Sequence, residues 1–250
     1  MNVPPWALAF FWGIVSGSSL LLGAAGGFFL NLNQRLIAAI MAFGGGVLIS
    51  ALTLELMEEA YANGGFVASS LGFIGGAVIY TLANILLARH GAKHRKRSGN
   101  QQPDSSSNSG MAIALGSLLD GIPESIVIGL SLIEHSNVKF ATVLAIFLSN
   151  VPEGLSSSSG MKKANRSAFY VFTLWGSICL FSGLASIAGF TLFRHFSPLI
   201  VSATTASAAG AILAMISDTM LPEAFEVTHN YTGLITVVGF LLSFVLSKNY

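Results

Sequence analysis

Apolar stretches of eighteen residues or more recur along the chain, and a stretch of that length is what an α-helix needs to cross a bilayer. Only 9% of the residues are charged and 53% are hydrophobic, which agrees with a membrane setting. We therefore predict an all-α, polytopic membrane protein in which a single transmembrane domain, residues 1–250, accounts for the whole chain. The eight predicted spans are Trp6–Phe29, Leu36–Leu56, Phe66–Leu87, Met111–Ile133, Phe140–Gly160, Ala168–Phe193, Ile200–Leu221 and Thr232–Leu246.

The basic residues are divided unequally between the two sides of the membrane. Because cytoplasmic loops carry an excess of Lys and Arg, the side that holds nine of the twelve should be the cytoplasm. Those nine are Arg35, Arg89, Lys93, Arg95, Lys96, Arg97, Lys162, Lys163 and Arg166. Both termini are then extracytoplasmic, in a plasma membrane or in the inner membrane of a bacterium. Topology alone explains these charges, so no nucleic acid partner is expected.

The longest predicted loop, residues 88–110, follows the third span. Its second half is polar and contains no aromatic residue. A segment of this composition buries too little apolar surface to order itself. We therefore predict that residues 88–110 form a disordered cytoplasmic loop.

Three carboxylates lie in the middle of apolar runs: Asp120 and Glu124 in the fourth span and Glu153 in the fifth. A carboxylate at the centre of a bilayer costs roughly 2.5 to 3.5 kcal/mol on insertion scales, so these groups need a positive partner. No Lys, Arg or His lies within any of the apolar runs. The natural counter-charge is therefore a proton or a metal cation that passes through, and a transport pathway is the leading hypothesis.

The spacing of these residues places oxygen atoms on shared helix faces. Asp120 and Glu124 are four residues apart in the fourth span, and Asn150 and Glu153 are three apart in the fifth. Each span also carries a proline directly before its glutamate, which frees a backbone carbonyl and kinks the helix at that level. The four side chains are predicted to converge on one cation site.

Two pairs of spans repeat each other. Residues 43–61 align with residues 207–225, and the fourth span aligns with the fifth at their leucine, proline and glutamate positions. The members of each pair cross the membrane in opposite directions in the predicted topology. We predict an inverted repeat of three, two and three helices, an arrangement in which secondary transporters place their ion site near the midplane.

The order of spans, the Pro-Glu pairs of spans four and five, and Leu-Pro-Glu-Ala at residues 221–224 together resemble the ZIP (Zrt/Irt-like) family of divalent metal transporters. The resemblance covers essentially the whole chain. It implies a metal site formed by Asp120, Glu124 and Glu153, with an amide oxygen from Asn150. The chain departs from the family at the histidine positions of the motif, where Asp120 and Ser149 stand. A second, adjacent metal site is depleted, because Ser186 stands where the family often has a glutamate.

The donor atoms bear on which metal is carried. An all-oxygen site suits manganese, ferrous iron or magnesium, whereas the resemblance points to zinc, which also accepts carboxylates. The metal is expected as a transported substrate, with no permanently bound cofactor and no catalytic residue. Glu55 and Asp218 lie near the ends of the matching spans two and seven, and are candidates for guiding ions along the pathway; capping or snorkelling would equally explain them.

Two other classes of function remain open. One is a proton-coupled carrier of another small solute, which would use the carboxylates as a relay. The other is an intramembrane aspartic protease with Asp120 and Asp218 as its dyad, which would leave both central glutamates unexplained. A transporter explains more of the residues, so the chain is expected not to be an enzyme. Its partners should be divalent cations and the lipid bilayer, and a homodimer is one option for its assembly.

Overall fold

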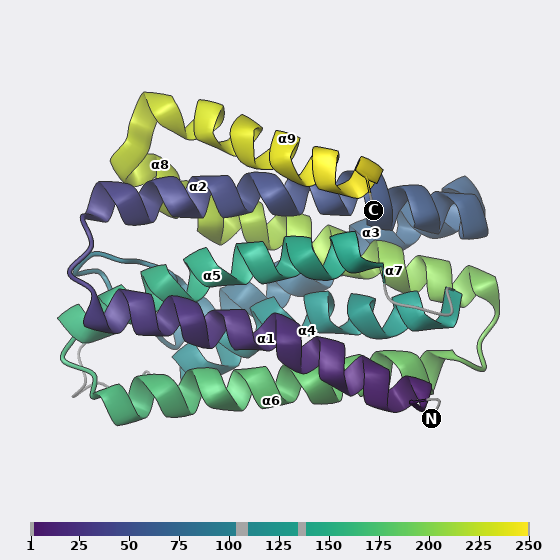
Figure 1. The fold of residues 1–250 in the computed structure, drawn as a ribbon, viewed down its shortest axis with the longest axis horizontal. Helices are drawn as coiled ribbons and strands as arrows, with labels where there is room; N and C mark the ends of the chain where they lie inside the picture. The colour runs from purple at the N-terminus through teal and green to yellow at the C-terminus, as the bar shows by residue number, and fades with distance from the viewer. Residues whose placement is uncertain (1–2, 104–109, 135–138, 250) are drawn as a thin grey trace.

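The computed structural model describes residues 3–103, 110–134 and 139–249, and over these ranges the chain is helical and contains no strand (Figure 1). The elements are α1 Pro5–Phe29, α2 Gln34–Ala51, η1 Leu52–Met57, α3 Glu58–Arg89, η2 Ala92–His94, α4 Gly110–Glu134, α5 Phe140–Lys163, α6 Ala168–Phe193, α7 Pro198–Met215, η3 Ile216–Met220, α8 Leu221–Thr228, η4 His229–Tyr231 and α9 Thr232–Asn249. The prediction of an all-helical protein is confirmed.

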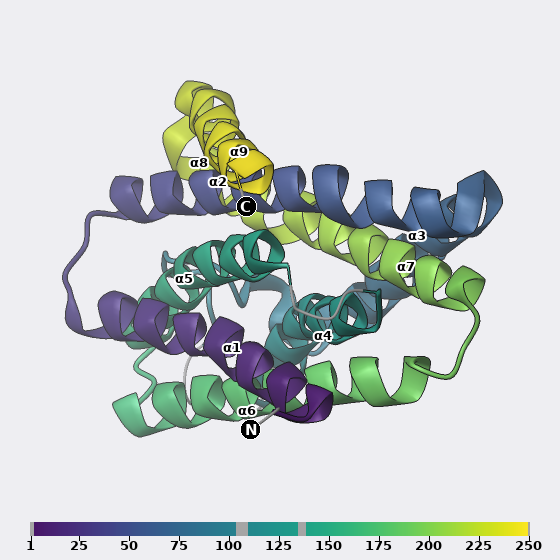
Figure 2. The same cartoon turned by 45° about the vertical axis from the view of Figure 1, so that its right-hand side comes forward.

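Five helical stretches within the described residues are long and apolar enough to cross a membrane, so the chain is a multi-pass membrane protein. Two of them, Gln34–Arg89 and Pro198–Lys248, are 56 and 51 residues long, more than twice what one crossing needs. Each contains a reversal. Gly65 has a φ of 70°, which a glycine adopts without strain, and it interrupts the helix with a kink. Figure 2 shows the chain turning back within α3. In the second stretch the chain reverses direction at the turn η4, between α8 and α9.

Helix α5 is not among the five stretches, although it is 24 residues long. Its second half is polar: it holds Asn150, Glu153 and four consecutive serines, Ser156–Ser159. All of these residues are buried within the bundle. The count of eight separate spans therefore stays a prediction, because length and composition identify only five stretches.

Small residues let the helices approach backbone to backbone. A Cβ atom built on Gly76 of α3 would lie 1.8 Å from the carbonyl oxygen of Ser207 on α7, and one on Gly210 of α7 would lie 1.9 Å from that of Phe73. Helix α1 packs on α5 in the same way, since a Cβ atom on Gly23 would lie 2.1 Å from the carbonyl oxygen of Val151. Such close packing is how membrane helices associate without a hydrophobic driving force.

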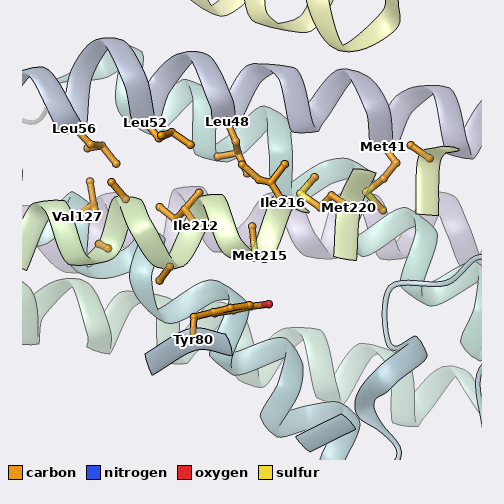
Figure 3. Packing of buried hydrophobic residues seen from close by; sticks show 14 of the residues in the cluster. Met41, Leu48, Leu52, Leu56, Tyr80, Val127, Ile212, Met215, Ile216 and Met220 are labelled. Carbon is orange, nitrogen blue, oxygen red and sulfur yellow. The ribbon is translucent and has the colours of Figure 1, made fainter. Parts of the chain in front are cut away.

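The largest apolar cluster lies between α2 with η1 and α7 with η3, and Val127 of α4 and Tyr80 of α3 also contribute to it (Figure 3). Tyr80 is 1% exposed and packs at the edge of this cluster. Its hydroxyl group is bound outside the cluster, by a carboxylate of α4. Tyr80 therefore connects the apolar core to the polar centre of the bundle.

A π-helical turn interrupts each member of the repeated pair of segments. One turn is η1, Leu52–Met57, and the other is η3, Ile216–Met220. In the alignment of residues 43–61 with 207–225, Leu52 falls opposite Ile216, so the two turns begin at equivalent positions. Since π turns are rare in helices, their coincidence supports the predicted inverted repeat.

The structure differs from the expected disorder of residues 88–110. Helix α3 continues to Arg89, η2 forms a turn at Ala92–His94, and residues 95–103 pack into the bundle between α4, α5 and α8. Residues 104–109 lie outside the described residues. The composition of the segment did not predict this order, because hydrogen bonds to buried carboxylates hold it and apolar burial does not. We refer to residues 92–103 as the basic segment.

Candidate functional site

The four predicted ligands all lie inside the bundle. Asp120 and Glu124 on α4 are 1% and 2% exposed, and Asn150 and Glu153 on α5 are 5% and 4% exposed. Pro123 and Pro152 lie within these helices, directly before the two glutamates.

The basic segment brings two cations to these carboxylates. The guanidinium of Arg95 donates from Nε to Oδ2 of Asp120 and from Nη2 to Oδ1, both at 2.7 Å. Asp120 Oδ1 also accepts from the hydroxyl of Tyr80 at 2.7 Å, and Arg95 Nη1 donates to Asn84 Oδ1 at 2.9 Å. Arg95 is 1% exposed, so this two-pronged ion pair is shielded from water.

Lys96 joins the two helices through its ammonium group. Its Nζ atom lies 2.8 Å from Oε2 of Glu153 and 3.4 Å from Oδ2 of Asp120. The expectation that only a proton or a passing ion could neutralise these acids therefore needs correction. No basic residue lies in the apolar runs, but two reach the carboxylates from the loop that follows α3.

Glu124 differs from Asp120 and Glu153 in its hydrogen bonding. Its Oε1 atom is buried and has no hydrogen-bond partner among the described residues. The charges that act on it come from Glu153, Lys96 and Asp120. An unsatisfied carboxylate oxygen in a buried site is a position where a proton or a cation would be stabilised.

Asn150 is tied to α1, since its Nδ2 atom donates to the carbonyl oxygen of Ser16 at 3.3 Å. Within residues 3–103, 110–134 and 139–249, no three His, Cys, Asp or Glu side chains are grouped closely enough to hold a metal ion. In this conformation the acids of α4 and α5 are instead arranged around Arg95 and Lys96.

Helix α5 receives the backbone of the basic segment. The hydroxyls of Ser156 and Ser157 donate to the carbonyl oxygens of Lys96 and Arg95, at 2.7 and 2.6 Å. One further turn along α5, a Cβ atom on Gly160 would lie 1.9 Å from the carbonyl oxygen of Arg97. The polar second half of α5 is thus a docking surface for this segment.

Gln102, near the C-terminal end of the basic segment, holds the segment in place through hydrogen bonds. Its Nε2 atom lies 3.1 Å from the carbonyl oxygen of Arg95, 2.9 Å from that of Arg97 and 2.9 Å from that of Ser157. Burial is the main reason that the pKa of the nearby His94 is lowered, and the charges of Arg97 and Lys93 add to this. The positive charge that the segment brings to the site therefore comes from arginine and lysine.

Glu223 of α8 is also part of the docking surface. Its Oε1 atom accepts from the backbone N–H and the hydroxyl of Ser98, at 2.8 and 2.6 Å, and its Oε2 atom lies 3.2 Å from Arg97. Arg97 is also paired with Glu226, which is more exposed. Glu223 is 2% exposed because the segment covers it.

Of the two pathway candidates, Glu55 lies at a cavity. The cavity has a volume of about 480 Å³, and its lining includes Glu55, Glu58, Glu59 and Lys139. Glu55 accepts a hydrogen bond from Thr142, and Lys139 lies 2.5 Å from Glu59. Asp218 lies on an exposed part of η3. Since Asp120 is buried and paired with Arg95, the two aspartates do not form the shared-proton dyad of a protease.

Sequence reasoning did not find Tyr80, Arg95 and Lys96 as parts of the site. A signal for the two cations was present: a run of three basic residues in the loop that leads to the fourth span, and buried acids with no partner in the spans. Nothing in the sequence distinguished that run from the ordinary excess of positive charge in cytoplasmic loops.

No protein-family model matches the chain. Curated proteins named zinc transporter ZupT do match it, from Escherichia coli O1:K1 / APEC, from E. coli O9:H4 (strain HS) and from E. coli (strain K12 / DH10B). Each is 28% identical over 236 residues, which cover 87% of this chain and 86% of the relative. These names are those of transporters and not of enzymes, in agreement with the expectation for this chain. Over most of its length, the chain is therefore similar to bacterial zinc transporters.

Proposed function

We propose that the chain is a membrane transporter of divalent metal cations, with zinc, manganese and ferrous iron as candidate substrates. The observation that carries the proposal is the buried group of acids on α4 and α5, in which Glu124 has an oxygen without a partner among the described residues. The similarity to zinc transporters supports the same substrate class. In this proposal Asp120, Glu124, Asn150 and Glu153 bind the ion in transit.

The pathway begins at the cavity that Glu55, Glu58 and Glu59 line, where the carboxylates attract cations. From there the ion reaches the acids of α4 and α5 and leaves on the side of the basic loops. The proposed architecture has eight spans, because two of the five apolar stretches turn back once, which makes seven, and α5 is the eighth. Motion of the two repeats against each other would open the site to either side in turn.

The central test is uptake by the purified protein in liposomes that enclose a metal-sensitive dye. We expect Zn²⁺, Mn²⁺ and Fe²⁺ to enter faster than in protein-free liposomes, with Mn²⁺ and Fe²⁺ competing effectively against Zn²⁺ because the donors are oxygens. Internal pH is recorded in the same liposomes. If the liposome interior acidifies when another solute is added, and no metal enters, the result would favour the proton-coupled carrier and reject the metal transporter.

The proposed topology has the basic loops in the cytoplasm and, because an even number of spans puts both termini on one side, both termini outside. Its test is Asn100→Cys, at an exposed position of the basic segment, with Cys179 replaced by alanine. We expect a membrane-impermeant maleimide to label this thiol only after the cells are permeabilised. Labelling in intact cells would contradict the proposed topology and place the basic loops outside.

A further inference from the structure

The basic segment brings to the acids of α4 and α5 the same charge as one divalent cation. Arg95 and Lys96 each carry one positive charge, and together they pair with Asp120 and Glu153. We propose that residues 92–103 are a tethered plug, in which these two side chains occupy the ion site in place of a divalent cation, and that transport requires their exchange for the ion. This proposal rests on the proposed function.

The contacts make the plug and the ion mutually exclusive. Both oxygens of Asp120 accept hydrogen bonds from Arg95, and Oε2 of Glu153 accepts from Lys96 at 2.8 Å. A metal ion needs the lone pairs of these same oxygens. It therefore binds fully only after Arg95 and Lys96 withdraw.

Charge balance gives the exchange a preference for divalent ions. When the two side chains leave, Asp120 and Glu153 are left with two uncompensated negative charges in a buried site, which is unfavourable. One divalent cation restores the balance, whereas Na⁺ or K⁺ leaves one charge uncompensated. Replacing the plug by a monovalent ion therefore costs more free energy than replacing it by a divalent ion.

The segment is docked through its backbone as well as through its charged groups. Ser156 and Ser157 of α5 bind its carbonyl oxygens, and Glu223 of α8 binds the N–H and hydroxyl of Ser98. It leaves α3 through Gly91, whose φ of 104° lies in the region that glycine adopts without strain. A docked segment with a glycine at its base has the form of a plug that moves as a unit.

A purely structural role for the ion pairs makes the opposite prediction for uptake. If Arg95 and Lys96 only stabilise the fold, removing them lowers uptake along with stability. If they compete with the ion, removing them raises uptake at low ion concentration. The direction of the change separates the two roles.

The first experiment compares Arg95→Ala/Lys96→Ala with Arg89→Ala/Lys163→Ala in the liposome assay. The control removes the same charge from two exposed positions outside the basic segment. At Mn²⁺ concentrations below half-saturation, we expect uptake to rise at least fivefold in the first variant and to stay within twofold of the parent in the control. Unchanged or lower uptake by a variant that elutes as a single species, beside an active parent, would overturn the plug.

The second experiment does not need the double variant to fold. Ala92 is 0% exposed, so Ala92→Cys in a Cys179→Ala background should be protected from maleimide while the plug is docked. We expect Mn²⁺ to accelerate its labelling in detergent at least fivefold over NaCl of equal ionic strength. Asn100→Cys is the control, since its exposed thiol should react quickly in both solutions.

The two experiments also separate this proposal from the proposed function. If the parent transports Mn²⁺ but Mn²⁺ leaves the labelling of Ala92→Cys unchanged, the plug is rejected and the transporter stands. If Mn²⁺ accelerates labelling while no liposome takes up metal, the exchange at the site is supported and the transport proposal fails.

Discussion

Replacing Glu124 by glutamine should reduce divalent-cation uptake at least about fivefold. The substitution keeps the shape of the side chain and removes its charge, at an oxygen that has no partner among the described residues. A hydrogen bond or contact to a charged group contributes ~1.5–3 kcal/mol. Losing one corresponds to a fall of roughly 10- to 150-fold in ion affinity. The measurement is the initial rate of Mn²⁺ uptake at a concentration near half-saturation for the parent.

Glu58→Gln is the matched control, because it makes the same chemical change at an exposed carboxylate beside the outer cavity. Its uptake should stay within about threefold of the parent, as expected when one solvent-screened charge is lost. Since Oε1 of Glu124 accepts no hydrogen bond from the described residues, Glu124→Gln should elute and unfold like the parent. If Glu124→Gln took up ions like the parent, Glu124 of α4 would not be part of the ion site.

Replacing Gly76 by leucine should prevent α3 and α7 from packing. The Cβ atom of the new side chain would lie 1.8 Å from the carbonyl oxygen of Ser207, and that oxygen belongs to the backbone and has no other rotamer. Overpacking costs about 1–3 kcal/mol even where side chains can adjust, so we expect at least the upper end of that range. For a chain of this size, that corresponds to a fall in Tm of about 6–12 °C.

Gly75→Leu provides the comparison on the neighbouring residue, where a Cβ atom meets nothing within 4 Å. The two variants have the same composition and hydropathy, so a difference between them reports packing alone. The readout is the fraction of monodisperse protein after heating, measured by size-exclusion chromatography. Equal stability of the two would mean that α3 and α7 do not meet at Gly76.

The burial of the acids was predictable from the sequence, because Asp120, Glu124 and Glu153 lie in the middle of apolar runs that only a membrane or a core accommodates. Their partners were not predictable. Arg95 and Lys96 lie in a polar loop whose order depends on the acids of α4 and α5, and such a long-range dependence leaves no local pattern. The burial of Glu223 under the same segment leaves no local pattern either.

Helix boundaries were predicted less well than helix identity. The predicted second span ends at Leu56, shortly before Glu58 and Glu59, but the helix continues through η1 and into α3 as far as Gly65. Charged residues end an apolar pattern without ending a helix, since the backbone continues to satisfy its own hydrogen bonds. The π turns were not predicted either. Their equivalent positions in the two repeats became apparent only when the structure was compared with the sequence alignment.

The depth of the basic segment determines how it responds to ionic strength. Dissolved salt weakens attraction between charges that water surrounds, over a Debye length of about 10 Å at 0.1 M. Arg95 and Lys96 are 1% and 3% exposed, so mobile ions do not reach their pairs with Asp120 and Glu153. The pair between Arg97 and the more exposed Glu226 lies within reach of the solution and is screened. A higher salt concentration in the surrounding solution would therefore weaken the contacts at the outer edge of the segment and leave its ion pairs with the central acids intact.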